Sequence, residues 1–89
     1  MRILGTLKTV SSVQWYEFYA EPGAELTSES HGKGSLESIT LCKGNLTVIV
    51  GDDIKTIYAG ETLRYHTDLP HKLKNEDDKD SHGIMVNLL

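Results

Sequence analysis

Turn-forming residues recur every eight to ten positions along the chain, and this spacing is what most constrains its fold. Clear cases are Glu-Pro-Gly at residues 21–23, Gly-Lys-Gly at 32–34 and Gly-Asp-Asp at 51–53. Proline and glycine supply the fixed and the positive φ angles that tight turns need. No segment between the turns keeps apolar residues at helical spacing over three turns. The spacing therefore predicts an all-β chain of roughly eight short strands in a sandwich or barrel.

The connections between these segments are too short for parallel crossovers, so the sheets are predicted to be antiparallel. Residues 1–12 are predicted to form a loose leader or an edge strand. Within residues 37–42 the side chains alternate between two faces, which groups Glu37 with Ile39 and Leu41. The predicted strands are residues 13–20, 24–31, 37–42, 46–50, 54–58, 62–66, 69–75 and 83–89.

The length of 89 residues predicts a single domain, residues 1–89. A chain this short buries a limited share of its surface, so either oligomerisation, as a homodimer, or a second covalent domain is expected. The aromatic residues of the first predicted strand are expected to pack between sheets, across a dimer contact or at a barrel mouth: Trp15, Tyr16, Phe18 and Tyr19. The residues predicted to form the core are Ile39, Leu41, Leu46, Val48, Leu63 and Met85.

Charge and cysteine content exclude several classes of function. The net charge is −4 and the nine basic residues are scattered, which argues against direct contact of these residues with a phosphate backbone. The single cysteine, Cys42, allows neither an internal disulfide nor a Cys-x-x-Cys zinc site. No apolar run approaches the roughly 20 residues of a membrane span, and the N-terminus lacks a signal-peptide pattern. A cytoplasmic location is therefore expected.

Side chains suited to metal binding or acid–base chemistry gather in one stretch and its distant counterpart. Glu29 and His31 are two apart, so they share one face of an extended strand. Glu37 opens the next apolar run, and His71 follows a proline about 40 residues after His31. These side chains converge only if the chain folds back on itself, as it would in a small barrel.

The same residues resemble the two signature motifs of the cupins, which are small double-stranded β-helices or jelly-roll barrels. In the first motif, glycine is followed by His-x-His, a glutamate and a second glycine, matched here by Gly23, Glu29, His31, Glu37 and Gly44. Glu29 stands where the family has its first histidine. In the second motif the matching residues are Gly60, Pro70, His71 and Asn75. The resemblance covers residues 23–75 by motif and nearly the whole chain by strand pattern.

The segments H-x-x-G-x-x-E (residues 31–37) and D-L-P-H-K-L-K-N (residues 68–75) are similar to one branch of the family. That branch is the C-terminal cupin domain of bacterial transcriptional regulators with an Xre-type helix-turn-helix. The resemblance implies a sensor domain for a small-molecule effector, with no catalytic residues and no membrane contact. DNA would be contacted only through a helix-turn-helix domain that is not present in this chain, which is then a separated domain or a stand-alone cupin.

The resemblance also implies the residues of the site. Ligand binding is expected at His31, Glu37 and His71, and Tyr65, which lies next to the second motif, is a further candidate as a residue of the barrel mouth. A divalent metal (zinc, iron, manganese or nickel) would be held by Glu29, His31, Glu37 and His71, since imidazoles and carboxylates suit these ions. His66 and His82 are expected to be ordinary surface histidines, and Asn75 is expected to hold a turn.

Three alternatives stay open at this level. The polar residues could form a network that binds an effector directly, without a metal. The chain could be a stand-alone metal-dependent cupin enzyme, such as a dioxygenase, isomerase or decarboxylase, because two histidines and a carboxylate with open positions suit non-haem iron chemistry. It could also be an interaction module that binds no ligand.

Overall fold

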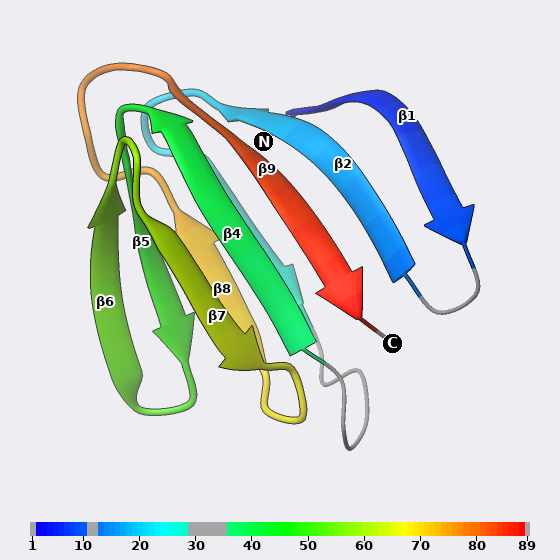
Figure 1. Ribbon diagram of the computed structural model, residues 1–89. Helices are drawn as coiled ribbons and strands as arrows, with labels where there is room; N and C mark the ends of the chain where they lie inside the picture. The colour runs from blue at the N-terminus through cyan, green and yellow to red at the C-terminus, as the bar shows by residue number, and fades with distance from the viewer. Residues whose placement is uncertain (1, 11–12, 29–35, 89) are drawn as a thin grey trace.

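The computed structural model describes residues 2–10, 13–28 and 36–88. This part of the chain forms nine strands in two antiparallel sheets (Figure 1). The larger sheet, in the order β1-β2-β9-β4-β7, contains β1 (Arg2–Val10), β2 (Val13–Ala20), β4 (Leu36–Lys43), β7 (Thr62–His66) and β9 (Ser81–Leu88). The smaller sheet, in the order β3-β8-β5-β6, contains β3 (Glu25–Ser28), β5 (Asn45–Val50), β6 (Asp53–Tyr58) and β8 (His71–Lys74).

The predicted all-β, antiparallel architecture is confirmed, and so is the position of most strands. The predicted strands 13–20 and 62–66 have the same bounds as β2 and β7. The N-terminal segment, for which a leader or an edge strand was predicted, is the edge strand β1 and pairs with β2 (Figure 1). The described residues contain no helix that is long and apolar enough to cross a membrane.

The hydrophobic core lies between the two sheets. Five of the six residues predicted for it are buried: Ile39, Leu41, Leu46, Val48 and Met85. The sixth, Leu63, is only partly buried at the edge of the core, because it also lines a cavity. The aromatic side chains of β2 lie on both faces of the larger sheet. Phe18 is fully buried and Tyr16 packs against the core, whereas Trp15 is 39% exposed.

Gly83 in β9 provides the space that the ring of Phe18 occupies. A Cβ atom at Gly83 would lie 2.8 Å from two ring carbons of Phe18 and 2.7 Å from the backbone oxygen of Thr40. Real Cβ atoms do not approach other atoms this closely, and the Thr40 oxygen belongs to the neighbouring strand β4. Glycine is therefore required here by packing between strands.

Two connections near one end of the barrel are tied together. Gly51, in the turn between β5 and β6, has a φ of 57°, which glycine adopts without strain. Its amide donates a hydrogen bond of 3.2 Å to the carbonyl of Pro70, in the connection between β7 and β8. This bond fixes the β5–β6 hairpin against the segment that leads into His71.

Asn75 holds the loop at residues 76–80, as the sequence predicted. Its side chain is fully buried, and its Nδ2 atom donates to the carbonyls of Ala20 (2.8 Å) and Lys79 (2.9 Å). Its Oδ1 atom accepts a hydrogen bond of 3.0 Å from the amide of Asp77. Each polar atom of the buried amide thus has a partner, which offsets the cost of its burial.

Candidate functional site

A group of polar side chains points into the barrel from three strands. Glu37 comes from β4, Tyr65 from β7 and His71 from β8. Strand alternation directs them inward: Glu37 shares a face with Ile39, and His71 shares one with Leu73. Glu37 and Tyr65 are register partners in the larger sheet, and His71 pairs with Val50 in the smaller one. Their exposed fractions are 2% for Glu37, 9% for Tyr65 and 4% for His71.

These three side chains, which we name the polar cluster, meet at one carboxylate oxygen. The hydroxyl of Tyr65 donates a hydrogen bond to Glu37 Oε1. The Nε2 atom of His71 lies 3.8 Å from the same oxygen. The ring centroids of Tyr65 and His71 are 5.6 Å apart, and the rings meet edge to face. The other ring nitrogen of His71, Nδ1, lies 3.3 Å from the carbonyl oxygen of Leu69, which can accept a hydrogen bond from it. Nε2 is therefore the ring nitrogen that faces Glu37.

Two other buried polar side chains, Asn87 and Thr67, each have an oxygen without a hydrogen-bond partner among the described residues. Asn87 pairs with Glu37 across β9 and β4, and its Oδ1 atom is buried without a hydrogen-bond partner among the described residues. Thr67, two residues after Tyr65, is fully buried, and its Oγ1 atom also has no hydrogen-bond partner among the described residues. Buried polar atoms without partners are costly and are uncommon in native proteins. Within residues 2–10, 13–28 and 36–88, these two atoms thus have unused hydrogen-bonding capacity.

Burial and the charge of Glu37 perturb the two tyrosines of this region. The pKa of Tyr16 is raised to about 12, chiefly by burial and then by the negative charge of Glu37, against a hydrogen bond with Asn87 that lowers it. The pKa of Tyr65 is raised further, by burial first and then by the charge of Glu37 and the hydrogen bond to it. Both hydroxyls therefore remain protonated, as hydrogen-bond donors, at neutral pH.

These raised pKa values predict a loss of stability in alkali. Below about pH 10 both the folded and the unfolded chain keep the tyrosine protons, so these residues add no pH dependence. Above the ordinary tyrosine pKa of 10.0, the tyrosines of the unfolded chain lose their protons, whereas Tyr16 in the folded chain keeps its proton up to about pH 12. The free energy of unfolding therefore falls as the pH rises through this range. We expect the urea midpoint to fall with pH over this window, and to fall less in Tyr16→Phe and Tyr65→Phe.

The matched control is Tyr58→Phe, because Tyr58 is 57% exposed on the edge strand β6. Other groups also titrate in alkali, so the informative quantity is the difference in slope between each variant and the wild type. Equal slopes for Tyr16→Phe, Tyr65→Phe and Tyr58→Phe would contradict the prediction.

The structure brings together three of the four residues predicted for ligand binding, namely Glu37, Tyr65 and His71. The fourth, His31, lies outside the described residues, and so does the predicted metal ligand Glu29. Within residues 2–10, 13–28 and 36–88, no three histidine, cysteine or acidic side chains are grouped as a metal site. Glu37 and His71 are thus the described members of the predicted metal set.

The other two histidines lie away from the polar cluster. His66 is exposed at the end of β7. His82 lies on the outer face of the larger sheet, where its Nε2 atom is 2.5 Å from Glu17 Oε2 and its ring stacks on Tyr19 at 4.4 Å. Their positions agree with the prediction that both are surface histidines.

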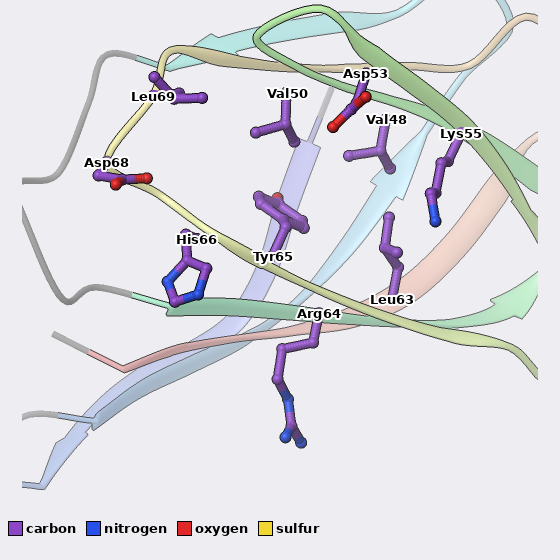
Figure 2. Close-up of a pocket in the computed structure, with 10 residues that line it drawn as sticks. All are labelled: Val48, Val50, Asp53, Lys55, Leu63, Arg64, Tyr65, His66, Asp68 and Leu69. Atoms are coloured by element: carbon purple, nitrogen blue, oxygen red, sulfur yellow. The ribbon is translucent and has the colours of Figure 1, made fainter.

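A cavity of about 390 Å³ opens beside the polar cluster, between the β5–β6 hairpin and β7 (Figure 2). Tyr65 belongs to its wall and so separates it from Glu37. We call it the side pocket; it is lined by Val48, Val50, Asp53, Lys55, Leu63, Arg64, Tyr65, His66, Asp68 and Leu69. Apart from Tyr65, none of these residues was predicted to bind a ligand. The available signal was the alternation of β6, which places Asp53 and Lys55 on the same face as the buried Ile57.

Comparison with known proteins identifies the family. Residues 16–87 match the family model described as "Cupin domain". The match spans most of the chain, including every described strand except β1, the start of β2 and the last residue of β9. The chain therefore belongs to the cupin domain family, as the sequence motifs predicted.

Among solved structures, the cupin domain of an XRE family transcriptional regulator from Enterobacter cloacae has a TM-score of 0.86 at 20% identity, covering 99% of this chain and 93% of that one. An HTH_3 family transcriptional regulator from Vibrio cholerae has a TM-score of 0.83 at 17% identity, covering 98% of this chain and 48% of that one. This chain thus spans about half the length of the Vibrio regulator. The Cnp3 cupin domain of Schizosaccharomyces pombe has a TM-score of 0.81 at 15% identity, covering 97% of this chain and 59% of that one. No curated protein matches the chain.

Proposed function

We propose that this domain is the small-molecule sensor of a bacterial helix-turn-helix transcriptional regulator. The effector would be a small polar molecule bound inside the barrel beside Glu37, Tyr65 and His71. The observation that carries the proposal is the buried polar cluster, together with the two buried oxygens, of Asn87 and Thr67, that have no described partner. The structural likeness to cupin domains of transcriptional regulators supports the regulatory half of the proposal.

The atoms around the site favour an effector that carries N–H or O–H donors. Asn87 Oδ1 can only accept a hydrogen bond, and the Thr67 hydroxyl can accept or donate one. Glu37 accepts from Tyr65 through one oxygen, which leaves acceptor capacity on the carboxylate. His71 can donate from Nε2 when it is protonated there, so an anionic group on the effector would be directed towards His71.

The donor set of the cluster also fits a divalent metal, which the cupin family implies. A carboxylate oxygen and an imidazole Nε2 that lie 3.8 Å apart can approach a common ion with a small adjustment, and Nδ1 of His71 faces a carbonyl, as is usual in metal-binding histidines. Glu37 and His71 would hold the ion, with His31 and Glu29 as the other ligands expected from the motif. The bound metal would supply a Lewis acid that attracts an anionic or carbonyl group of the effector.

Effector binding would be transmitted through a homodimer. Large apolar side chains are exposed on the outer face of the larger sheet, where Trp15 is 39%, Ile84 42% and Leu88 39% exposed. Such a face suits burial against a second copy. The effector would shift the equilibrium between two arrangements of this dimer, and so alter a DNA-binding domain joined in cis.

The test is to purify the protein without a chelator or a histidine tag and to measure its metal content by elemental analysis, followed by a Zn²⁺ titration monitored by ¹H–¹⁵N NMR. We expect near-stoichiometric metal, or NMR shifts on added Zn²⁺, that disappear in Glu37→Gln and in His31→Ala/His71→Ala. The matched control His66→Gln, on an exposed histidine of the adjacent strand, is expected to keep the metal.

The outcomes separate the alternatives. Metal that is lost only in the cluster variants supports the site, and turnover of a substrate by the metal-loaded protein would instead indicate a metal-dependent enzyme. Metal that persists in both cluster variants would contradict the assignment of these ligands. If no metal binds, the cluster remains a candidate for direct effector binding, which is then read from NMR shifts of Tyr65 and His71 in a screen of small polar molecules.

A further inference from the structure

We propose that the side pocket is a second binding site, and that it binds an apolar α-amino acid. This goes beyond the proposed sensor site, because the side pocket and the polar cluster have only Tyr65 in common. The proposal rests on three features of the pocket: an apolar wall, two opposite charges on one strand face, and a volume suited to a small molecule.

The apolar wall is contributed by both sheets. Val48 and Val50 project from β5, and Leu63 and Tyr65 project from β7 (Figure 2). The hydroxyl of Tyr65 is already engaged by Glu37, so the pocket receives the ring of this residue. The cavity volume of about 390 Å³ lies near the lower end of the range for small-molecule pockets, which is roughly 300–1,000 Å³. A branched aliphatic side chain, such as that of leucine, suits this wall and this size.

The charges come from the edge strand β6. Asp53 pairs with Val50 and Lys55 pairs with Val48, so both charged residues share the inward face with those valines. Figure 2 shows Asp53 and Lys55 directed from β6 towards β7, across the opening of the pocket. Neither side chain forms an ion pair or a hydrogen bond with any residue that the structure describes. A carboxylate and an ammonium group therefore stand at the rim without being neutralised by each other.

Two opposite charges beside an apolar wall match an α-amino acid better than a simple acid or amine. The ligand ammonium would pair with Asp53, its carboxylate would pair with Lys55, and its aliphatic side chain would cover Val48 and Val50. Alternating residues of a strand are separated by about 6.5–7 Å, so the two groups can hold the adjacent charges of one zwitterion. Arg64 also lines the pocket, but Figure 2 shows its side chain on the opposite side of β7 from Asp53 and Lys55.

Inward-pointing charges on an edge strand have a second explanation, since they also discourage pairing with other sheets. That role requires charge alone, of either sign and in any order. The amino-acid proposal requires both signs together with the apolar wall. The two explanations therefore predict different results in binding experiments.

The test is isothermal titration calorimetry of the whole chain with L-leucine and three analogues. We expect binding of leucine, and at least tenfold weaker binding of 4-methylpentanoate (no ammonium), 3-methylbutylamine (no carboxylate) and glycine (no aliphatic side chain). Lys55→Met and Asp53→Asn are each expected to weaken leucine binding at least tenfold. The matched control Asp52→Asn changes an exposed acidic residue that does not line the pocket, and it is expected to bind leucine as the wild type does.

Thermal unfolding of each variant shows that it is folded before it is titrated. Absence of leucine binding at millimolar concentration, or binding that neither Lys55→Met nor Asp53→Asn weakens, would overturn the proposal. Leucine binding that is lost in Glu37→Gln but kept in Lys55→Met would place the amino acid at the polar cluster and would also overturn it. Failure of leucine to bind beside an intact metal or effector response at Glu37 and His71 would leave the sensor proposal standing.

Discussion

Replacing His71 by alanine is expected to lower the free energy of unfolding by about 2–5 kcal/mol, the usual cost of truncating a large buried side chain and leaving a cavity. The buried imidazole lies 3.8 Å from the carboxylate of Glu37, which is only 2% exposed, so its loss leaves a gap beside this group; among the described residues, Tyr65 still donates a hydrogen bond to it. The measurement is urea unfolding of the wild type and of His71→Ala at neutral pH.

Two further variants separate the loss of the pair from the loss of packing. His66→Ala removes an exposed histidine and is expected to change the free energy of unfolding by no more than about 0.5 kcal/mol. Combining His71→Ala with Glu37→Gln removes the uncompensated carboxylate, so the double variant is expected to be more stable than His71→Ala alone. A loss below about 1 kcal/mol in His71→Ala, or a double variant that is less stable still, would contradict the buried pair as a source of stability.

Replacing Phe18 by alanine is expected to cost about 3–5 kcal/mol, because its fully buried ring packs over Gly83 in the core and its removal would leave a cavity. Replacing Gly83 by alanine is expected to cost about 1–3 kcal/mol for the opposite reason, since the added methyl group would overlap the same ring and the Thr40 oxygen. The two effects are expected to be coupled. The methyl group that Gly83→Ala introduces would partly fill the cavity left by Phe18, so the double variant should lose less stability than the sum of the single variants.

Chemical unfolding of the four proteins in this double-mutant cycle measures the coupling. Ile54→Ala serves as a control for the removal of an apolar side chain, because Ile54 is 67% exposed on β6 and its loss should be small. Strict additivity of Phe18→Ala and Gly83→Ala would show that the ring and the added methyl group do not compete for the same space.

Much of the fold could be predicted from the sequence because turns and alternation are local properties. The glycine and proline turns fixed the ends of β2 and β7, and alternation within residues 37–42 predicted that Ile39 and Leu41 face the core. The exact start of β8 was less predictable. It begins at His71 and not at residue 69, because Pro70 lacks the amide proton that a strand ladder needs and its carbonyl accepts a bond from Gly51 instead.

The candidate site was predictable in part, for a different reason. Motif spacing identified Glu37 and His71. Strand alternation also predicts that both side chains point into the barrel. The side pocket was not found, because it depends on how residues of β5, β6 and β7 come together in space, which strand alternation does not give. Likewise, the sequence alone predicts that Asp53 and Lys55 are ordinary charged residues of a surface strand. Only the packing of their register partners Val50 and Val48 shows that they line a pocket.

The position of β9 has a consequence for how this domain forms during its synthesis. The last strand of the chain, at residues 81–88, is the central strand of the larger sheet, between β2 and β4. Strand β2 pairs with β1 on one side, and its partner on the other side is made much later, as shown by the pair Glu17 and Ile84. Contacts at such separation slow folding, and ribosomes add about 5–20 residues per second. The last strand of the smaller sheet, β8, ends at Lys74, whereas the larger sheet closes only once β9 has also been made.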